Sequence, residues 1–199
     1  MVYSDFSLEG AVKTFELKYS EVADLFGKEP NLECSQLLAE TLKRSVPLGL
    51  ASNSQKSRAE MITAPILIEL TEQLQNRISL FSGIDFNVDS ERGLYGSCDF
   101  LMGNSSGLLL LVAPVIILVE AKPENLNSEL GECVAEMLGA RIFNEREGND
   151  IPAIYGAVTS GNIWKFFRLK NQVIEIDLTE SYLTEVNKIL GILASAINN

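Results

Sequence analysis

Apolar positions repeat at helical spacing in the first part of the chain and at strand spacing further on. Residues 1–52 hold two amphipathic stretches, the second ending at Pro47, and they predict an N-terminal helical section. Apolar residues then recur at helical intervals from Asn53 to Arg77, with Pro65 inside the pattern. A proline there either kinks one long helix or starts a second one, and we prefer the kink.

Short apolar runs replace this pattern after residue 78. Three or four strands are predicted in a row, within Ser79–Asn87, Leu94–Met102, Leu108–Val112 and Val115–Glu120. The last run is apolar on both faces, which is typical of a buried central strand. Next come a helix capped by Ser128 and running to about Asn144, a strand at Ile151–Thr159, a hairpin of Trp164–Leu169 and Gln172–Leu178 turning near Asn171, and a helix opened by Thr179. The order of elements predicts an α/β chain.

Composition is that of an ordinary globular protein, with 199 residues, 46% hydrophobic and 22% charged. We expect one domain over 1–199, divided into the helical section 1–52, a core at 53–178 and a C-terminal helix at 179–199. The longest apolar run is interrupted by Pro114 and is too short to cross a bilayer. The first residues lack the pattern of a signal peptide, so we expect a cytoplasmic protein with no membrane partner.

The chain has no histidine, which excludes a Ser-His-Asp or Cys-His hydrolase. Its cysteines, Cys34, Cys98 and Cys133, are widely spaced, so we expect free thiols and no zinc site. Catalysis would have to rest on carboxylates, lysine, hydroxyls or a metal. The net charge of −11 disfavours tight unaided binding of nucleic acid, although a local basic strip can coexist with it.

Three charged residues stand out by their placement in the predicted strands. Asp99 lies inside one strand, and Glu120 and Lys122 end the most apolar one. Since strand side chains alternate, Glu120 and Lys122 point to one face, and pairing with the strand of Asp99 would bring all three together. Two carboxylates about 4 Å apart repel unless a cation lies between them, and oxygen ligands suit Mg²⁺ or Mn²⁺. A structural ion pair with a spare carboxylate is the alternative.

This arrangement resembles a known signature. Asp99, 20 intervening residues and then Glu120-Ala121-Lys122 resemble the D…(D/E)-x-K motif of the PD-(D/E)XK nuclease superfamily. The resemblance covers roughly residues 53–169, including the order helix, strands, helix and strand. Cys98 stands in place of the name-giving proline. The whole chain is similar to a stand-alone, uncharacterised bacterial branch rather than to a restriction enzyme of known target.

The resemblance implies a restriction-endonuclease-like central mixed sheet flanked by helices. It implies metal coordination by Asp99 and Glu120, and catalysis by these two residues with Lys122. Relatives often add a carboxylate from the preceding helix, for which Glu60 is the best match and Glu69 the second choice. Glu132 occupies the position where many relatives carry a glutamine.

Other charged groups are open to two interpretations. Glu129, Glu132 and Glu136 share one helical face, which we interpret as an acidic solvent face, with Glu132 near the metal cleft as the alternative. One basic stretch, Lys165 to Lys170, interleaves charges with aromatic residues. It would either contact phosphates and bases or form an edge hairpin with a buried aromatic face, and we prefer the hairpin.

The leading hypothesis is a Mg²⁺-dependent nuclease acting on DNA or RNA. One rival is a non-catalytic binding or assembly domain whose acidic surface faces a protein, and another is a binder of nucleotides or acidic small molecules. A cleft lined by Lys56, Arg58 or Arg168 would favour nucleic acid, and a cleft ringed by glutamates would disfavour it. A homodimer would present two clefts to a duplex, but the sequence carries no dimer signature.

Overall fold

The computed structural model describes residues 1–52, 54–75, 77–107, 109–122 and 125–198. The strands are β1 (Lys18–Val22), β2 (Ser79–Asp85), β3 (Ser97–Gly103), β4 (Val115–Ala121), β5 (Ile154–Thr159), β6 (Ile163–Lys170), β7 (Val173–Asp177) and β8 (Ser181–Tyr182). The α-helices are α1 (Leu8–Thr14), α2 (Gln36–Ala51), α3 (Gln55–Arg58), α4 (Ala64–Gln73), α5 (Leu130–Arg146) and α6 (Val186–Asn198). Short 3₁₀ segments precede α1 and α6, and a π-helical turn joins α3 to α4.

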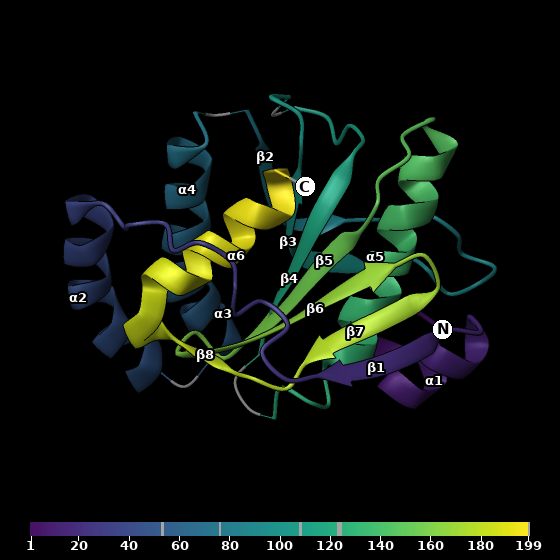
Figure 1. Cartoon of the computed structure of the whole chain (residues 1–199), viewed down its shortest axis with the longest axis horizontal. Helices are drawn as coiled ribbons and strands as arrows, with labels where there is room; N and C mark the ends of the chain where they lie inside the picture. The colour runs from purple at the N-terminus through teal and green to yellow at the C-terminus, as the bar shows by residue number, and fades with distance from the viewer. Residues whose placement is uncertain (53, 76, 108, 123–124, 199) are drawn as a thin grey trace.

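All the strands form one mixed sheet between two layers of helices (Figure 1). The strand order is β1-β7-β6-β5-β4-β3-β2, with β8 paired to β6. Only the pairs β4–β5 and β1–β7 are parallel. Helices α2, α4 and α6 share one hydrophobic core with the sheet, and α1 and α5 share the other. The predicted α/β fold, a central mixed sheet flanked by helices, is confirmed.

Strand β4 lies at the centre, and every one of its residues is buried. Ile117, Val119 and Ala121 join the core under α4 and α6, whereas Leu118 joins the core under α5. Because side chains alternate along a strand, Glu120 follows Leu118 toward α5. The charged end of the most apolar strand is therefore directed at a helix, not at solvent.

The N-terminal section was predicted to be helical throughout. This prediction is wrong, because the section contains the edge strand β1. This strand pairs in parallel with β7, and four of its five residues are exposed. A strand without a buried face has no apolar alternation to reveal it. The predicted hairpin of Trp164–Leu169 and Gln172–Leu178 is confirmed as β6 and β7. The prediction that it lies at the sheet edge is wrong, because β1 pairs with β7 on its outer side. Its aromatic residues are core, as predicted.

Helical boundaries differ from the prediction at several points. The helix through Pro65 continues without interruption from α3 to α4, and the turn before the proline widens into the π-helical segment Ala59–Thr63. Helix α5 is capped at Glu129 rather than at Ser128. The last helix begins at Val186 instead of Thr179, because β8 and a 3₁₀ turn come first.

The apolar run after β3 does not form the optional fourth strand. Its residues 109–112 lie outside any strand, and Leu109 is fully open to solvent. Leu108, which begins that run, lies outside the described residues. So does Asn53, where the predicted helical pattern starts.

Candidate metal and catalytic site

The ladder between β3 and β4 ends where the predicted site begins. Phe100 and Val119 are the last pair in register. Beyond them, the Asp99 main-chain N–H donates to Glu120 Oε1 at 3.1 Å, and the Ala121 N–H donates to Asp99 Oδ2 at 2.9 Å. The two carboxylates thus stand in for carbonyls of the ladder, and they are held beside each other at the strand end.

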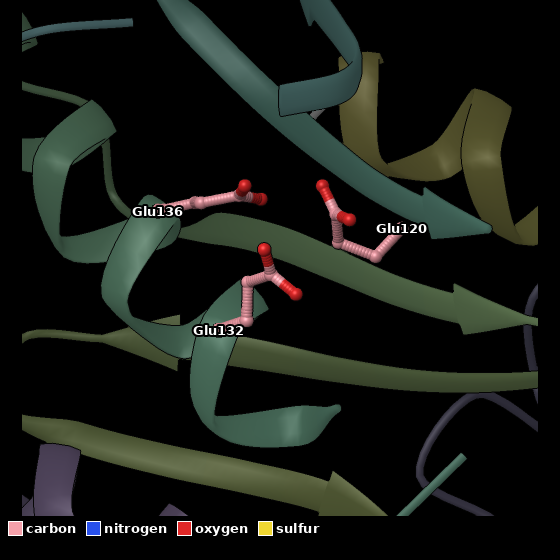
Figure 2. A group of neighbouring side chains, drawn as sticks. All are labelled: Glu120, Glu132 and Glu136. Atoms are coloured by element: carbon pink, nitrogen blue, oxygen red, sulfur yellow. The ribbon is translucent and has the colours of Figure 1, made fainter. Parts of the chain in front are cut away.

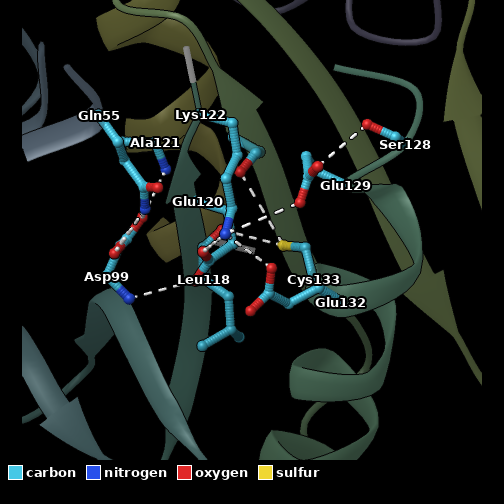
Figure 3. Close-up of polar contacts among 11 residues, drawn as sticks. Gln55, Asp99, Leu118, Glu120, Ala121, Lys122, Ser128, Glu129, Glu132 and Cys133 are labelled. Atoms are coloured by element: carbon cyan, nitrogen blue, oxygen red, sulfur yellow. Dashed lines mark hydrogen bonds and ion pairs between the residues drawn. The ribbon is translucent and has the colours of Figure 1, made fainter. Parts of the chain in front are cut away.

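The Asp99 carboxylate turns toward α3. It accepts a hydrogen bond from Gln55 Nε2 at 3.1 Å (Figure 3). It also lines a pocket of about 380 Å³ together with Gln55, Lys56 and Glu60. The Glu60 side chain is 61% exposed and forms a 3.8 Å ion pair with Lys56. Asp99 and Glu60 therefore border the same pocket, and their assignment as metal ligands stays a prediction.

Lys122 lies on the other side of β4, within a ring of carboxylates. Its ammonium group is 2.7 Å from Glu132, 3.5 Å from Glu120 and 3.7 Å from Glu129. Figure 3 shows these contacts converging on Nζ. Burial lowers the pKa of Lys122, but the carboxylates of Glu120 and Glu132 outweigh it, so the pKa is raised above the ordinary lysine value. The surrounding carboxylates therefore favour the charged form of Lys122.

Glu120 also belongs to a second group, with two glutamates from successive turns of α5. One carboxylate oxygen from each of Glu120, Glu132 and Glu136 lies within 4.8 Å of the others. Figure 2 shows the three carboxylates directed at one another. Across the described parts of the chain, this is the one group of three or more metal-ligating side chains that converges so closely. We call it the glutamate triad.

Glu136 is the most deeply placed member of the triad. Its side chain has no exposed surface, and neither carboxylate oxygen makes a hydrogen bond of acceptable geometry to the rest of the described chain. Burial, reinforced by the charge of Glu132, raises the pKa of Glu136 to about 8. Burial and the charge of Glu136 likewise raise the pKa of Glu120 well above its ordinary value. Burial therefore favours the protonated forms of Glu120 and Glu136.

The predicted acidic solvent face is wrong for two of its three residues. Glu132 and Glu136 are buried, because α5 packs on β4 and β5 with most of its circumference. The sequence did contain a sign of this burial, because apolar residues occur on all sides of the helix, and a helix that is hydrophobic on every side is a buried one. Glycine at 131 completes the packing, because a Cβ there would lie 2.2 Å from the backbone ahead of α1.

Glu69, the second choice for an additional ligand, lies away from the site. Its carboxylate accepts hydrogen bonds from the main-chain N–H of Ser35 at 2.8 Å and from its hydroxyl at 2.7 Å, just ahead of α2. Its role is to hold the start of that helix.

The candidate basic residues are engaged in different places. Arg58 donates to the Ser160 carbonyl, Arg168 pairs with Glu175 at 2.8 Å, and Lys165 donates to Asn127. Lys56 alone among the candidate phosphate contacts borders the Asp99 pocket. Carboxylates therefore dominate the α5 side of β4, and one lysine accompanies Asp99 on the α3 side.

No protein-family model matches the chain, and no curated protein matches it either. Within the described ranges, every helix is too short or too polar to cross a membrane.

Proposed function

We propose that this protein is a metal-dependent phosphodiesterase of the nuclease kind, acting on DNA or RNA. One observation carries the proposal: at one strand end, the Asp99 N–H donates to the Glu120 carboxylate and the Ala121 N–H donates to the Asp99 carboxylate, with Lys122 next along the chain. The order of a helix, three antiparallel strands, a helix and a parallel strand also agrees with the resemblance to PD-(D/E)XK nucleases.

The donor set fits a hard divalent cation. Asp99 and Glu120 supply only oxygen atoms, which is the chemistry of Mg²⁺ and Mn²⁺ sites rather than zinc sites. These two residues would hold the ion. Glu60, which lines the pocket beside Asp99, is a further predicted ligand. A bound ion of this kind polarises a phosphate oxygen and acidifies a coordinated water.

Lys122 would act as a fixed positive charge. Its raised pKa makes it a poor general base, so it cannot take a proton from water near neutral pH. It would instead donate hydrogen bonds to phosphate oxygens that gain negative charge as the bond to the leaving oxygen breaks. Its longest ion pair, to Glu129 at 3.7 Å, is the contact that it can exchange for a phosphate most easily.

Substrate binding would use the pocket beside Asp99. Lys56 lines that pocket and can contact a backbone phosphate, while Gln55 holds the Asp99 carboxylate in place. The rest of the charge distribution gives the substrate little help, because the chain carries a net charge of −11. Because few basic side chains contact the phosphates, substrate binding is expected to depend only weakly on ionic strength.

One observation favours the non-catalytic alternative. The ring of Glu120, Glu129 and Glu132 around Lys122 repels phosphate and suits a binding or assembly domain whose acidic surface meets a protein. The choice between the two functions rests on whether the strand end cleaves.

A cleavage assay separates the two functions. Single- and double-stranded DNA and RNA are incubated with the wild type, Asp99→Asn, Lys122→Met and the surface control Lys13→Met, in Mg²⁺ or Mn²⁺ and in EDTA. We expect metal-dependent cleavage by the wild type and the control, and a loss of about 100-fold or more in the two site variants. Cleavage that persists in Asp99→Asn would contradict the assignment. If the wild type cleaves none of the four substrates, the nuclease proposal is contradicted and the non-catalytic binding domain is the function that remains.

A further inference from the structure

The glutamate triad lies on the α5 side of β4, apart from the pocket that Asp99 borders. Glu132 and Glu136 stand four residues apart, so they project from the same face of α5. Glu120 meets them from the sheet, and the three carboxylates converge (Figure 2). The hydrogen bond from the Asp99 main chain fixes one oxygen of Glu120.

The triad has more negative charge than its surroundings neutralise. Lys122 forms ion pairs with Glu120 and Glu132, but Glu136 has no ion pair within the part of the chain that the structure describes. A buried carboxylate without a partner costs several kcal/mol, and hydrophobic residues would fill the same space at lower cost. The two buried Glu136 oxygens, which have no hydrogen-bond partner and face two other carboxylates, therefore form a set of ligands that a cation would stabilise.

We propose that the glutamate triad binds one divalent cation of the Mg²⁺ and Mn²⁺ class, at a site distinct from the Asp99 pocket. Oxygen ligands of Mg²⁺ lie about 2.1 Å from the ion, so opposite ligands lie about 4 Å apart. Adjacent ligands lie about 3 Å apart, so the three oxygens, which are within 4.8 Å of one another, would move inward when the ion binds. Glu120, Glu132 and Glu136 each supply one oxygen, and water completes the shell.

This site goes beyond the proposed hydrolysis and does not depend on it. A protein that cleaves nothing would still bind the ion at the triad. Conversely, Glu132 and Glu136 are not among the proposed ligands of the cleaving site, so their substitution separates the two proposals.

Binding of Mn²⁺ to the full chain tests the proposal. It is measured by calorimetry and by the electron paramagnetic resonance signal of the free Mn²⁺ that remains. The variants are Glu136→Gln and Glu132→Gln in the triad, Asp99→Asn outside it, and Glu129→Gln as the matched control on the same helix. Loss of an outer contact to a metal ligand costs about 10- to 100-fold in affinity, so losing a ligand should cost at least as much. We expect both triad variants to lose one Mn²⁺ ion that Asp99→Asn and Glu129→Gln keep.

Two results would overturn the proposal. One is Mn²⁺ binding by both triad variants with the stoichiometry and affinity of the wild type, and the other is loss of all Mn²⁺ binding in Asp99→Asn. Circular dichroism checks that each variant folds. If Glu136→Gln does not fold, Glu132→Gln still tests Mn²⁺ binding at the triad, because Glu132 lies closer to the protein surface. Absent cleavage with intact triad binding would count against the proposed function alone.

Discussion

Replacing Glu136 by glutamine should stabilise the metal-free protein. The wild-type carboxylate is fully buried and lacks a hydrogen bond on either oxygen. Glutamine has nearly the same shape and no charge, and its amide can donate to the facing carboxylates of Glu120 and Glu132. The substitution therefore replaces a buried ionisable group by a neutral one that can donate hydrogen bonds to the facing carboxylates.

The size of the gain follows from the pKa of Glu136. Folding raises this pKa from 4.5 to about 8, so the folded state binds the proton more tightly than the unfolded state. The wild type is thus not penalised below about pH 4.5, and it loses stability as the pH rises through about 8. At pH 7 the penalty is roughly 3 kcal/mol, and above pH 8 it approaches roughly 5 kcal/mol, as an upper limit.

Urea denaturation in EDTA at pH 5, 7 and 8 measures this difference between Glu136→Gln and the wild type. The variant should be the more stable protein at pH 7, by an amount that grows with pH. Mn²⁺ at about 100 times its Kd should then add about 3 kcal/mol to the wild type and little to the variant. A variant that is less stable than the wild type in EDTA at every pH would refute the reasoning, and so would a difference that does not change with pH.

Three predictions concern the stability of the fold. Glu69→Gln should lower the free energy of unfolding by about 1–2 kcal/mol at pH 7, because its carboxylate accepts two hydrogen bonds from Ser35. Burial raises the pKa of Glu69, but the hydrogen bonds that its carboxylate accepts keep this pKa below its usual value. The stabilisation is therefore complete above about pH 4.5 and should disappear at lower pH, as measured by urea denaturation. Asn144→Ala should cost about 2–3 kcal/mol in the same assay, because its buried amide bonds to both main-chain groups of the first residue of β4; a loss below 1 kcal/mol would contradict that role. Gly131→Ala should lower the melting temperature, because its Cβ would lie 2.2 Å from backbone ahead of α1, and a variant as stable as the wild type would show that α1 can shift freely.

The central part of the fold and the strand-end residues could be predicted because their signals are local. Strand β4 is a continuous apolar run that ends in two charges, and its alternation alone places Glu120 and Lys122 on one face. The β6–β7 hairpin was equally readable, because the turn at Asn171 separates two apolar runs.

The remainder depends on packing between distant segments. Strand β1 joins the sheet through main-chain hydrogen bonds with β7, which leave no pattern in exposed side chains. The burial of Glu136 follows from the contact of α5 with β4 and β5, and helical spacing by itself suggested a solvent face. The surroundings of Asp99 also required the structure, because its carboxylate accepts a hydrogen bond from Gln55 of α3 and lines a pocket there.

Glu120 is common to both proposed cation sites, so a calorimetric titration of Mn²⁺ into the wild type and Glu120→Gln tests the account most directly. The Asp99 main chain and the triad both meet this carboxylate. We predict Mn²⁺ binding by the wild type and none by Glu120→Gln, with both proteins equally folded by circular dichroism. Equal binding by the two proteins would contradict the account, and so would a wild type that binds no Mn²⁺ even when a short oligonucleotide is present.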